Sequence, residues 1–360
     1  MSIKLKFKYS LYSLVLALVI GGFVISATGG NPLDTYMTVL VGSFGSVKAV
    51  MSVLAYATPL ILTGLGCVVA FQGGVFNIGG EGQLCVGGLA AVIAGLYVQL
   101  PWPYGLIISL IAGFVAGAIW ALIPTLMVGK NLASLFVGTV MMNSIGVSFS
   151  EYLVKYYFLK PQASTTETAN VNAGAILPRF NPNTQLNYGI ILAVILVFVV
   201  AWLLYKTPAG FSIRAIGVNP DASMQAGINV FNRTALTMII SGGICGLAGA
   251  VQCLGIYNRW IMGFSPGYGW DGITVATLAG INPFGVLLTG SFFGMLRSAS
   301  ISMNLSDKVP IDMITALQGL VVIFVASPTL WTTFRNLFGN LQAKIKPAGV
   351  TAVRGKGGKG

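Results

Sequence analysis

The chain carries few side chains of the types that perform covalent chemistry. It contains no histidine, which removes imidazole proton relays, histidine-activated nucleophiles and the usual zinc sites. It also lacks a G-x-x-x-x-G-K-[ST] phosphate loop, so any ATP hydrolysis that drives it must occur on another chain. Its cysteines lie in or beside apolar runs without a C-x-x-C pair, and we interpret them as small packing residues: Cys67, Cys85, Cys245 and Cys253. We therefore expect a protein that is not an enzyme, with no catalytic residue, metal site or bound cofactor.

Polar side chains interrupt an apolar pattern in GGVFNIGGEGQL, residues 73–84. A carboxylate such as that of Glu81 is costly at membrane depth unless it meets a partner, backbone amides or water. Either Glu81 stabilises the first turn of the helix that follows, or this segment lines a path or gate for a solute. The residues that we assign to a path or gate are Phe76, Asn77, Glu81, Gln83, Asn143, Trp270, Asp271 and Asn282.

Other members of that set have a second interpretation. Asn143 can bond a neighbouring helix, and Asp271 can cap the short span that begins beside it. The aromatic residues Trp260, Tyr268 and Trp270 are either anchors at the membrane interface or surfaces on which a planar solute stacks. The residue types alone do not separate these alternatives.

The polar segment IGVNPDASMQAGI, residues 216–228, predicts a short helix with complete caps between two long apolar runs. Asn219 suits the N-cap, Pro220 the first helical position and Asp221 the first turn, where the helix dipole favours an anion. Gly227 suits the left-handed residue that follows a helix. We assign the following residues to contact with another protein: Arg214, Gly217, Asn219, Pro220, Asp221, Ala222, Ser223, Met224, Gln225 and Gly227. Of these, Asp221, Ser223, Met224 and Gln225 are expected to face the partner.

Composition indicates which elements must position these residues. Of 360 residues, 55% are hydrophobic and 8% are charged, whereas about a quarter are charged in soluble domains. Several apolar runs approach the roughly 20 residues that span a bilayer, so we expect an all-α polytopic membrane protein. Ten spans are predicted, at about 10–28, 49–70, 82–99, 104–128, 132–155, 187–206, 234–256, 270–281, 284–300 and 311–331. The eighth and ninth are short, and a broken or re-entrant pair is the alternative for them.

The net charge of +12 is explained by membrane topology better than by nucleic-acid binding. With both termini in the cytoplasm, thirteen Lys and Arg residues fall on the cytoplasmic side and six outside, which obeys the positive-inside rule. The segment 216–228 then lies in the cytoplasm. We expect one transmembrane domain over residues 1–335 and a basic, glycine-rich, disordered cytoplasmic tail over 336–360.

The order of the spans predicts an inverted repeat, because spans two to five and seven to ten are equal in number and run in opposite directions. Within spans, Gly113 and Gly117, Gly242 and Gly246, and Gly290 and Gly294 are spaced for close helix packing. The longest outer segment, about 156–186, is either a linker or a surface that docks an external partner.

Several motifs resemble one family. GGVFNIGGEGQLCVGG, residues 73–88, resembles the FNIGxEGQ signature of permease subunits of bacterial ABC importers for nucleosides, ribose-type sugars and branched-chain amino acids. RAIGVNPDASMQAGI, residues 214–228, is similar to the family's cytoplasmic loop, although Ser223 replaces an alanine there. Residues 267–297 resemble a segment of its nucleoside branch, and residues 29–46 resemble that branch's first outer segment. The resemblance covers about residues 10–330.

The resemblance implies a type II-like ABC importer permease fold, with a coupling helix within 214–229. It implies three protein partners: an ATPase that uses ATP and Mg, a second related permease in a heterodimer, and an external substrate-binding lipoprotein. The implied function is translocation of nucleosides, with purine nucleosides first, across the bacterial inner membrane. An ABC permease for a sugar or a flavin is an alternative within the family.

A secondary transporter driven by an ion gradient is the rival class, since inverted repeats and broken helices occur there too. That class needs intramembrane acids to couple ion and solute, and the candidates are Glu81, Asp271 and Asp312. The capped cytoplasmic helix has no evident role in such a protein. Uptake that needs ATP would separate the two classes.

Overall fold

The computed structural model describes residues 31–130 and 132–304, together with residues 19, 21–23, 26 and 319. The predicted tail and Asp312 lie outside the described residues, as do all of the predicted last span except residue 319 and most of the predicted first span.

The described part of the chain is helical and contains no β-strand beyond two isolated bridges. Eight helices correspond to the second to ninth predicted spans: α3 (Val47–Gln72), α4 (Gly80–Tyr97), α5 (Tyr104–Gly129), α6 (Leu135–Leu153), α7 (Gly189–Lys206), α10 (Val230–Gln252), α11 (Tyr268–Leu278) and α12 (Pro283–Asn304). π-Helical turns extend α6 over Val154–Phe158 and α10 over Cys253–Tyr257. Six of these helices, all but α6 and α11, are long and apolar enough to cross a membrane. The prediction of an all-α polytopic membrane protein is confirmed.

Among the described residues, three α-helices lie outside the predicted spans, and each begins with a capping residue followed by proline. α2 (Pro32–Phe44) starts after Asn31, α8 (Pro208–Val218) after Thr207, and α9 (Pro220–Gln225) after Asn219. Only α9 was predicted from this signal. The same rule, applied to the other two Xaa-Pro pairs, would have located α2 and α8.

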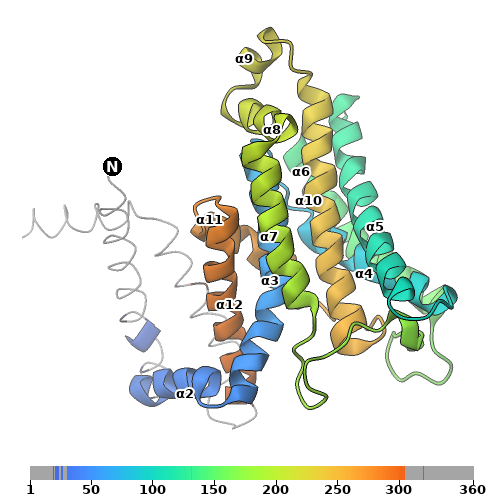
Figure 1. Ribbon diagram of the computed structural model, residues 1–360, viewed down its shortest axis with the longest axis vertical. Coiled ribbons are helices and arrows are strands. Elements are labelled where there is room, and N and C mark those ends of the chain that lie inside the picture. Colours follow the sequence, from blue (N-terminus) through green and yellow to red (C-terminus); the bar gives the residue numbers. More distant parts are fainter. Residues whose placement is uncertain are drawn as a thin grey trace, which may run out of the picture.

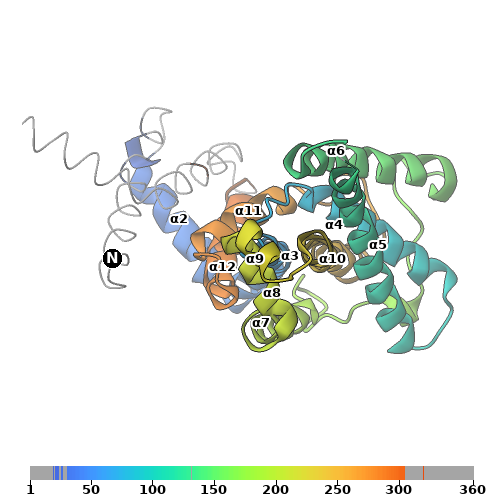
Figure 2. The ribbon, with the colours of Figure 1, turned by 90° about the horizontal axis from the view of Figure 1, so that it is seen from above.

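α3 and α10 form the centre of the molecule and run antiparallel (Figures 1 and 2). In each, 89% of the most apolar stretch is buried, compared with 33% in α5 and α7, which lie on the periphery. Gly66 of α3 lies against the Ser241 carbonyl of α10, and Gly73 lies against Thr237. These contacts fix the register of the two central helices.

The helix contacts show a two-fold pattern. α10 packs against α4 and α5, as α3 packs against α11 and α12, and α4 contacts α5 as α11 contacts α12. Because α3 and α10 run in opposite directions, this is the pattern of an inverted repeat in which α3, α4 and α5 correspond to α10, α11 and α12. The central helix of each half packs against the other half. Figure 2 shows α4 and α5 on one side of the central pair and α11 and α12 on the other.

The predicted packing of small residues is confirmed between α5 and α10. A Cβ atom on Gly117 would meet the carbonyl oxygen of Gly242, and one on Gly246 would meet the carbonyl oxygen of Gly113. Backbones this close exclude any larger side chain, which explains the spacing of four residues in both helices.

α11 corrects the prediction of a full crossing at 270–281. With 11 residues it is about 16 Å long, roughly half the apolar thickness of a bilayer. Its first carbonyl, that of Tyr268, accepts a hydrogen bond of 3.0 Å from Thr63 near the middle of α3. Just beyond its end, the Ile281 carbonyl accepts one of 2.9 Å from Gln72, the last residue of α3. α11 is therefore a half-length helix that begins inside the protein, whereas α12, the ninth predicted span, is long and apolar enough to cross a membrane by itself.

The long segment between α6 and α7 is folded onto the end of the molecule opposite to α9 (Figure 1). The Thr168 amide donates to the Trp260 carbonyl at 3.0 Å, and the Met262 amide donates to the Thr166 carbonyl at 2.9 Å. Glu167 pairs with Lys160 and Arg259 at 3.7 and 3.1 Å. This segment, residues 159–188, is therefore an ordered cap rather than a loose linker, and we call it the outer cap.

Candidate functional site

The start of α4 is the centre of a buried polar network. Residues 73–79 connect the end of α3 to the start of α4, and Asn77 in this segment is fully buried. Its Nδ2 atom donates to Gln83 Oε1 at 3.0 Å and to Ser241 Oγ of α10 at 2.9 Å. Its Oδ1 atom accepts from the Gly79 amide and from Gln83 Nε2, both at 3.0 Å. One asparagine thus joins the turning segment to two helices.

Glu81 connects the starts of two helices. It lies in the first turn of α4 with 7% of its surface exposed, and its Oε2 atom accepts a 2.6 Å hydrogen bond from the Gly269 amide in the first turn of α11. The N-terminal ends of both helix dipoles favour an anion at this point. Among the described residues Glu81 has no ion pair, and the Gly269 amide donates to its carboxyl group. A Cβ atom at Gly269 would collide with the Glu81 backbone, which explains glycine there.

Asn143 is the third member of this junction. Its Oδ1 atom accepts from the Gly82 amide at 2.8 Å, and it is 5% exposed. The neighbouring Met142 carbonyl accepts from Trp120 Nε1 of α5 at 2.9 Å. The prediction that Asn143 bonds a neighbouring helix is confirmed, because it holds α6 against the start of α4.

The remaining residues assigned to a path or gate lie around this junction or away from it. Trp270 is 48% exposed and Asp271 is half-buried, both in the first turns of α11 and next to Gly269. Phe76 is 53% exposed, with its ring 4.8 Å from that of Phe71. Asn282 accepts a 2.9 Å hydrogen bond from the Phe284 amide and starts α12 at the far end of α11. The structure thus places Trp270 and Asp271 next to the bond between Gly269 and Glu81, but it leaves Asn282 away from this junction.

The structure places Trp260 differently from the sequence-based interpretation and shows contacts for Arg297 that the sequence did not indicate. Trp260 is 1% exposed beneath the outer cap, so it is not an anchor at the membrane interface. Arg297, to which no role was assigned, donates from Nη2 to the Pro266 carbonyl at 3.0 Å and lies 5.9 Å from the Tyr268 ring. A lone arginine in an apolar span is costly enough to mark a functional position.

The predicted capped helix is α9, which lies at the end of the molecule opposite to the segment between α6 and α7 (Figure 1). Asn219 Oδ1 accepts from the Ala222 amide at 3.0 Å, and Gly227 has a φ of +82°. The Ile228 amide donates to the Ser223 carbonyl and the Gly227 amide donates to the Met224 carbonyl, each at 3.0 Å. This pair of bonds is a Schellman motif, and both predicted caps are confirmed.

α8 attaches α9 to the membrane-spanning helices. Arg214 Nε donates to the Leu204 carbonyl of α7 at 3.0 Å, and Gly217 lies against the backbone of Gly74. Ser223 is 5% exposed and donates to the Asn219 carbonyl at 2.8 Å, so the expectation that its side chain faces a partner is wrong. The exposed residues of the predicted set are Asn219, Pro220, Asp221, Ala222, Met224, Gln225 and Gly227.

Comparisons with known proteins identify the family. The family model described as the permease component of the branched-chain amino acid transport system matches residues 49–326. The chain belongs to this permease family. It is 32% identical to the guanosine ABC transporter permease protein NupP of Bacillus subtilis, over 93% of this chain and 96% of that protein. No solved structure matches it.

Two further relatives have similar names. The permease is 30% identical to the nucleoside ABC transporter permease protein NupB of Lactococcus lactis, over 88% of this chain and 89% of that protein. It is 31% identical to a second Bacillus subtilis protein, the guanosine ABC transporter permease protein NupQ, over 70% of this chain and 81% of that protein. The chain is thus a multi-pass membrane protein of a permease family with nucleoside transporters among its relatives.

Proposed function

We propose that this permease is the membrane-spanning subunit of an ATP-driven importer that moves nucleosides, purine nucleosides first, across the bacterial inner membrane. The names of the three relatives support the substrate class, and the coverage of nearly all of NupP supports a shared role. Because the sequence contains no phosphate loop, we assign ATP hydrolysis to a separate ATPase that binds ATP and Mg. This chain itself performs no covalent chemistry.

The working importer contains a second related permease and an external substrate-binding lipoprotein. Two different guanosine permeases of Bacillus subtilis both match this chain, which supports a heterodimer of related permeases. The folded outer cap between α6 and α7 provides the surface on which the lipoprotein docks. Both termini lie in the cytoplasm under this proposal, on the side of α9.

The observation that carries the proposal is the exposed apolar tip formed by α8 and α9. Val218 is 87% exposed and Met224 is 62% exposed, beyond the ends of the apolar spans. Apolar side chains exposed at an aqueous end mark a surface that another protein covers. We assign this tip, with Asp221 and Gln225 beside it, to the ATPase.

The contacts supply a mechanical route from that tip to the junction of α4 and α11. Gly217 of α8 touches Gly74, which lies three residues before the buried Asn77. A displacement of α9 by the ATPase thus moves the segment 73–79 and the start of α4. We assign the gate to this junction, with Phe76, Trp270 and Asp271 at its exposed edges.

The test is the association of the ATPase with a Met224→Asp variant in the assembled importer. A charge at the centre of an apolar contact should reduce the ATPase that co-purifies by roughly tenfold or more, with loss of nucleoside uptake. Ser164→Asp, an exposed position at the opposite end, is the matched control for ATPase association and should retain the bound ATPase. Undiminished ATPase association in Met224→Asp would refute the assignment of α9.

A further inference from the structure

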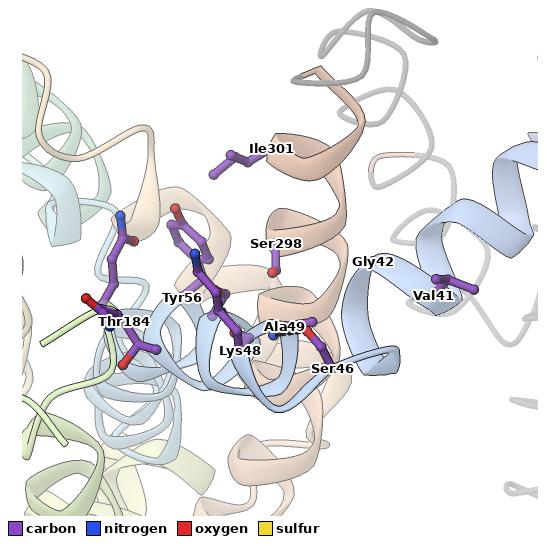
Figure 3. Close-up of a pocket in the computed structure, with 12 residues that line it drawn as sticks. Val41, Gly42, Ser46, Lys48, Ala49, Tyr56, Thr184, Ser298 and Ile301 are labelled. Atoms are coloured by element: carbon purple, nitrogen blue, oxygen red, sulfur yellow. Dashed lines mark hydrogen bonds between the residues drawn. The ribbon is translucent and has the colours of Figure 1, made fainter. Parts of the chain in front are cut away.

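A polar cavity of about 520 Å³ opens at the end of the molecule opposite to α9. It lies between α2, the first turns of α3, residues 183–185 of the outer cap and the last turns of α12. Figure 3 shows Lys48 and Tyr56 of α3 facing the same space as Ser298 and Ile301 of α12. Small-molecule sites have volumes of about 300–1,000 Å³, so the cavity is large enough for a solute of nucleoside size.

The chemistry of the lining favours a neutral solute with many hydrogen-bonding groups. The described lining holds neutral donors and acceptors: Ser46, Ser52, Tyr56, Asn183, Gln185 and Ser298. It contains one cation, Lys48, and no carboxylate among the described lining residues. A metal ion or the ammonium group of an amino acid would find no charged partner there.

A line of polar side chains continues from this cavity toward the junction of α4 and α11. The Arg297 guanidinium, one residue from the cavity residue Ser298, lies 5.9 Å from the ring of Tyr268. Gln252 beside Tyr268 is 1% exposed, and no hydrogen bond of good geometry satisfies its amide. Gly269, next to Tyr268, bonds Glu81.

We propose that this cavity is the outer site at which a nucleoside enters the permease. The Tyr56 ring provides a surface on which a base stacks, and the Asn183 and Gln185 carboxamides match the paired donor and acceptor on a base edge. The serine hydroxyls bond the ribose. The inference rests on the proposed function and extends it, because it assigns a place and a mode of recognition.

Engineered cysteines test occupancy directly. The chain has four native cysteines, and all four are buried, so a cysteine placed in the cavity is the accessible thiol of this chain. Ser52→Cys, with Ala49→Cys as a second lining position, is labelled with a membrane-impermeant thiol reagent in right-side-out vesicles that hold the complete importer. The extent of labelling is measured as the increase in mass of this chain by mass spectrometry, with and without guanosine as the probe. Ser164→Cys, exposed on the outer cap, is the control.

Saturating guanosine should slow labelling of Ser52→Cys and Ala49→Cys at least fivefold and leave Ser164→Cys unchanged. Adding Asn183→Ala should raise the guanosine concentration needed for protection about three- to tenfold, the effect of one lost hydrogen bond. An importer that takes up guanosine while both cavity cysteines stay unprotected would overturn this proposal alone. An importer that takes up no nucleoside would overturn it together with the proposed function.

Discussion

Glu81 illustrates what residue types reveal and what they leave open. Its position after a glycine-rich break indicated a carboxylate at the start of a helix, and the structure confirms that position. The hydrogen-bond partner of Glu81 could not be predicted from the sequence, since Gly269 lies 188 positions away along the chain. The same holds for Asn143 and Gly82, which are 61 positions apart. Long-range backbone partners depend on tertiary packing, and residue type carries no signal for them.

The bond between Glu81 and Gly269 makes a prediction about stability. Glu81→Ala leaves a buried amide without an acceptor, which should lower the free energy of unfolding by roughly 1–3 kcal/mol. Glu81→Gln keeps an acceptor oxygen and should lose less. The measurement is the thermal unfolding midpoint of the purified importer.

Glu151→Ala is the matched control for this prediction. It removes a half-buried carboxylate on α6 that makes no hydrogen bond or ion pair among the described residues. It should leave the midpoint nearly unchanged. Equal midpoints for Glu81→Ala and Glu151→Ala would show that the junction does not depend on the Glu81 carboxylate.

At the scale of elements, local signals predicted α9 well and α11 poorly. The caps of α9 involve neighbours within five residues, so the sequence around 219–228 contains the whole motif. The start of α11 has one local side-chain bond, of 3.3 Å from the Tyr268 amide to Ser265 Oγ, and its N-cap Gly267 has no side chain to add another. α11 begins where it does because Thr63 and Glu81 bond its first turn, and those contacts exist only in the fold.

Gly227→Val tests the rigidity of α9. Gly227 has a φ of +82°, which a β-branched side chain adopts at a cost of about 1–2 kcal/mol or more, although a Cβ atom there would meet no other atom within 4 Å. The helix end should fray, so that the ratio of nucleoside taken up to ATP hydrolysed falls severalfold. Ala226→Val, at an ordinary φ of −79° and also exposed, should keep the wild-type ratio. If Gly227→Val keeps the wild-type ratio of nucleoside taken up to ATP hydrolysed, the C-terminal end of α9 has no role in coupling.

At the scale of the whole molecule, the inverted repeat explains why the junction forms where it does. α4 and α11 occupy equivalent places against the central pair of α10 and α3, and each follows an irregular segment that re-enters the protein. Their starts therefore meet at the centre. The sequence predicted the repeat from the number and direction of spans, but these do not reveal that the starts of α4 and α11 touch.

ATP-dependent nucleoside uptake is the most direct test of the central claim. The complete importer is reconstituted in proteoliposomes with the lipoprotein outside, and uptake of labelled guanosine is measured with and without ATP and Mg inside. We predict uptake only when ATP, Mg and the lipoprotein are all present, whether or not an ion gradient is imposed. Guanosine uptake that an ion gradient drives in the absence of ATP would contradict the account and favour a secondary transporter.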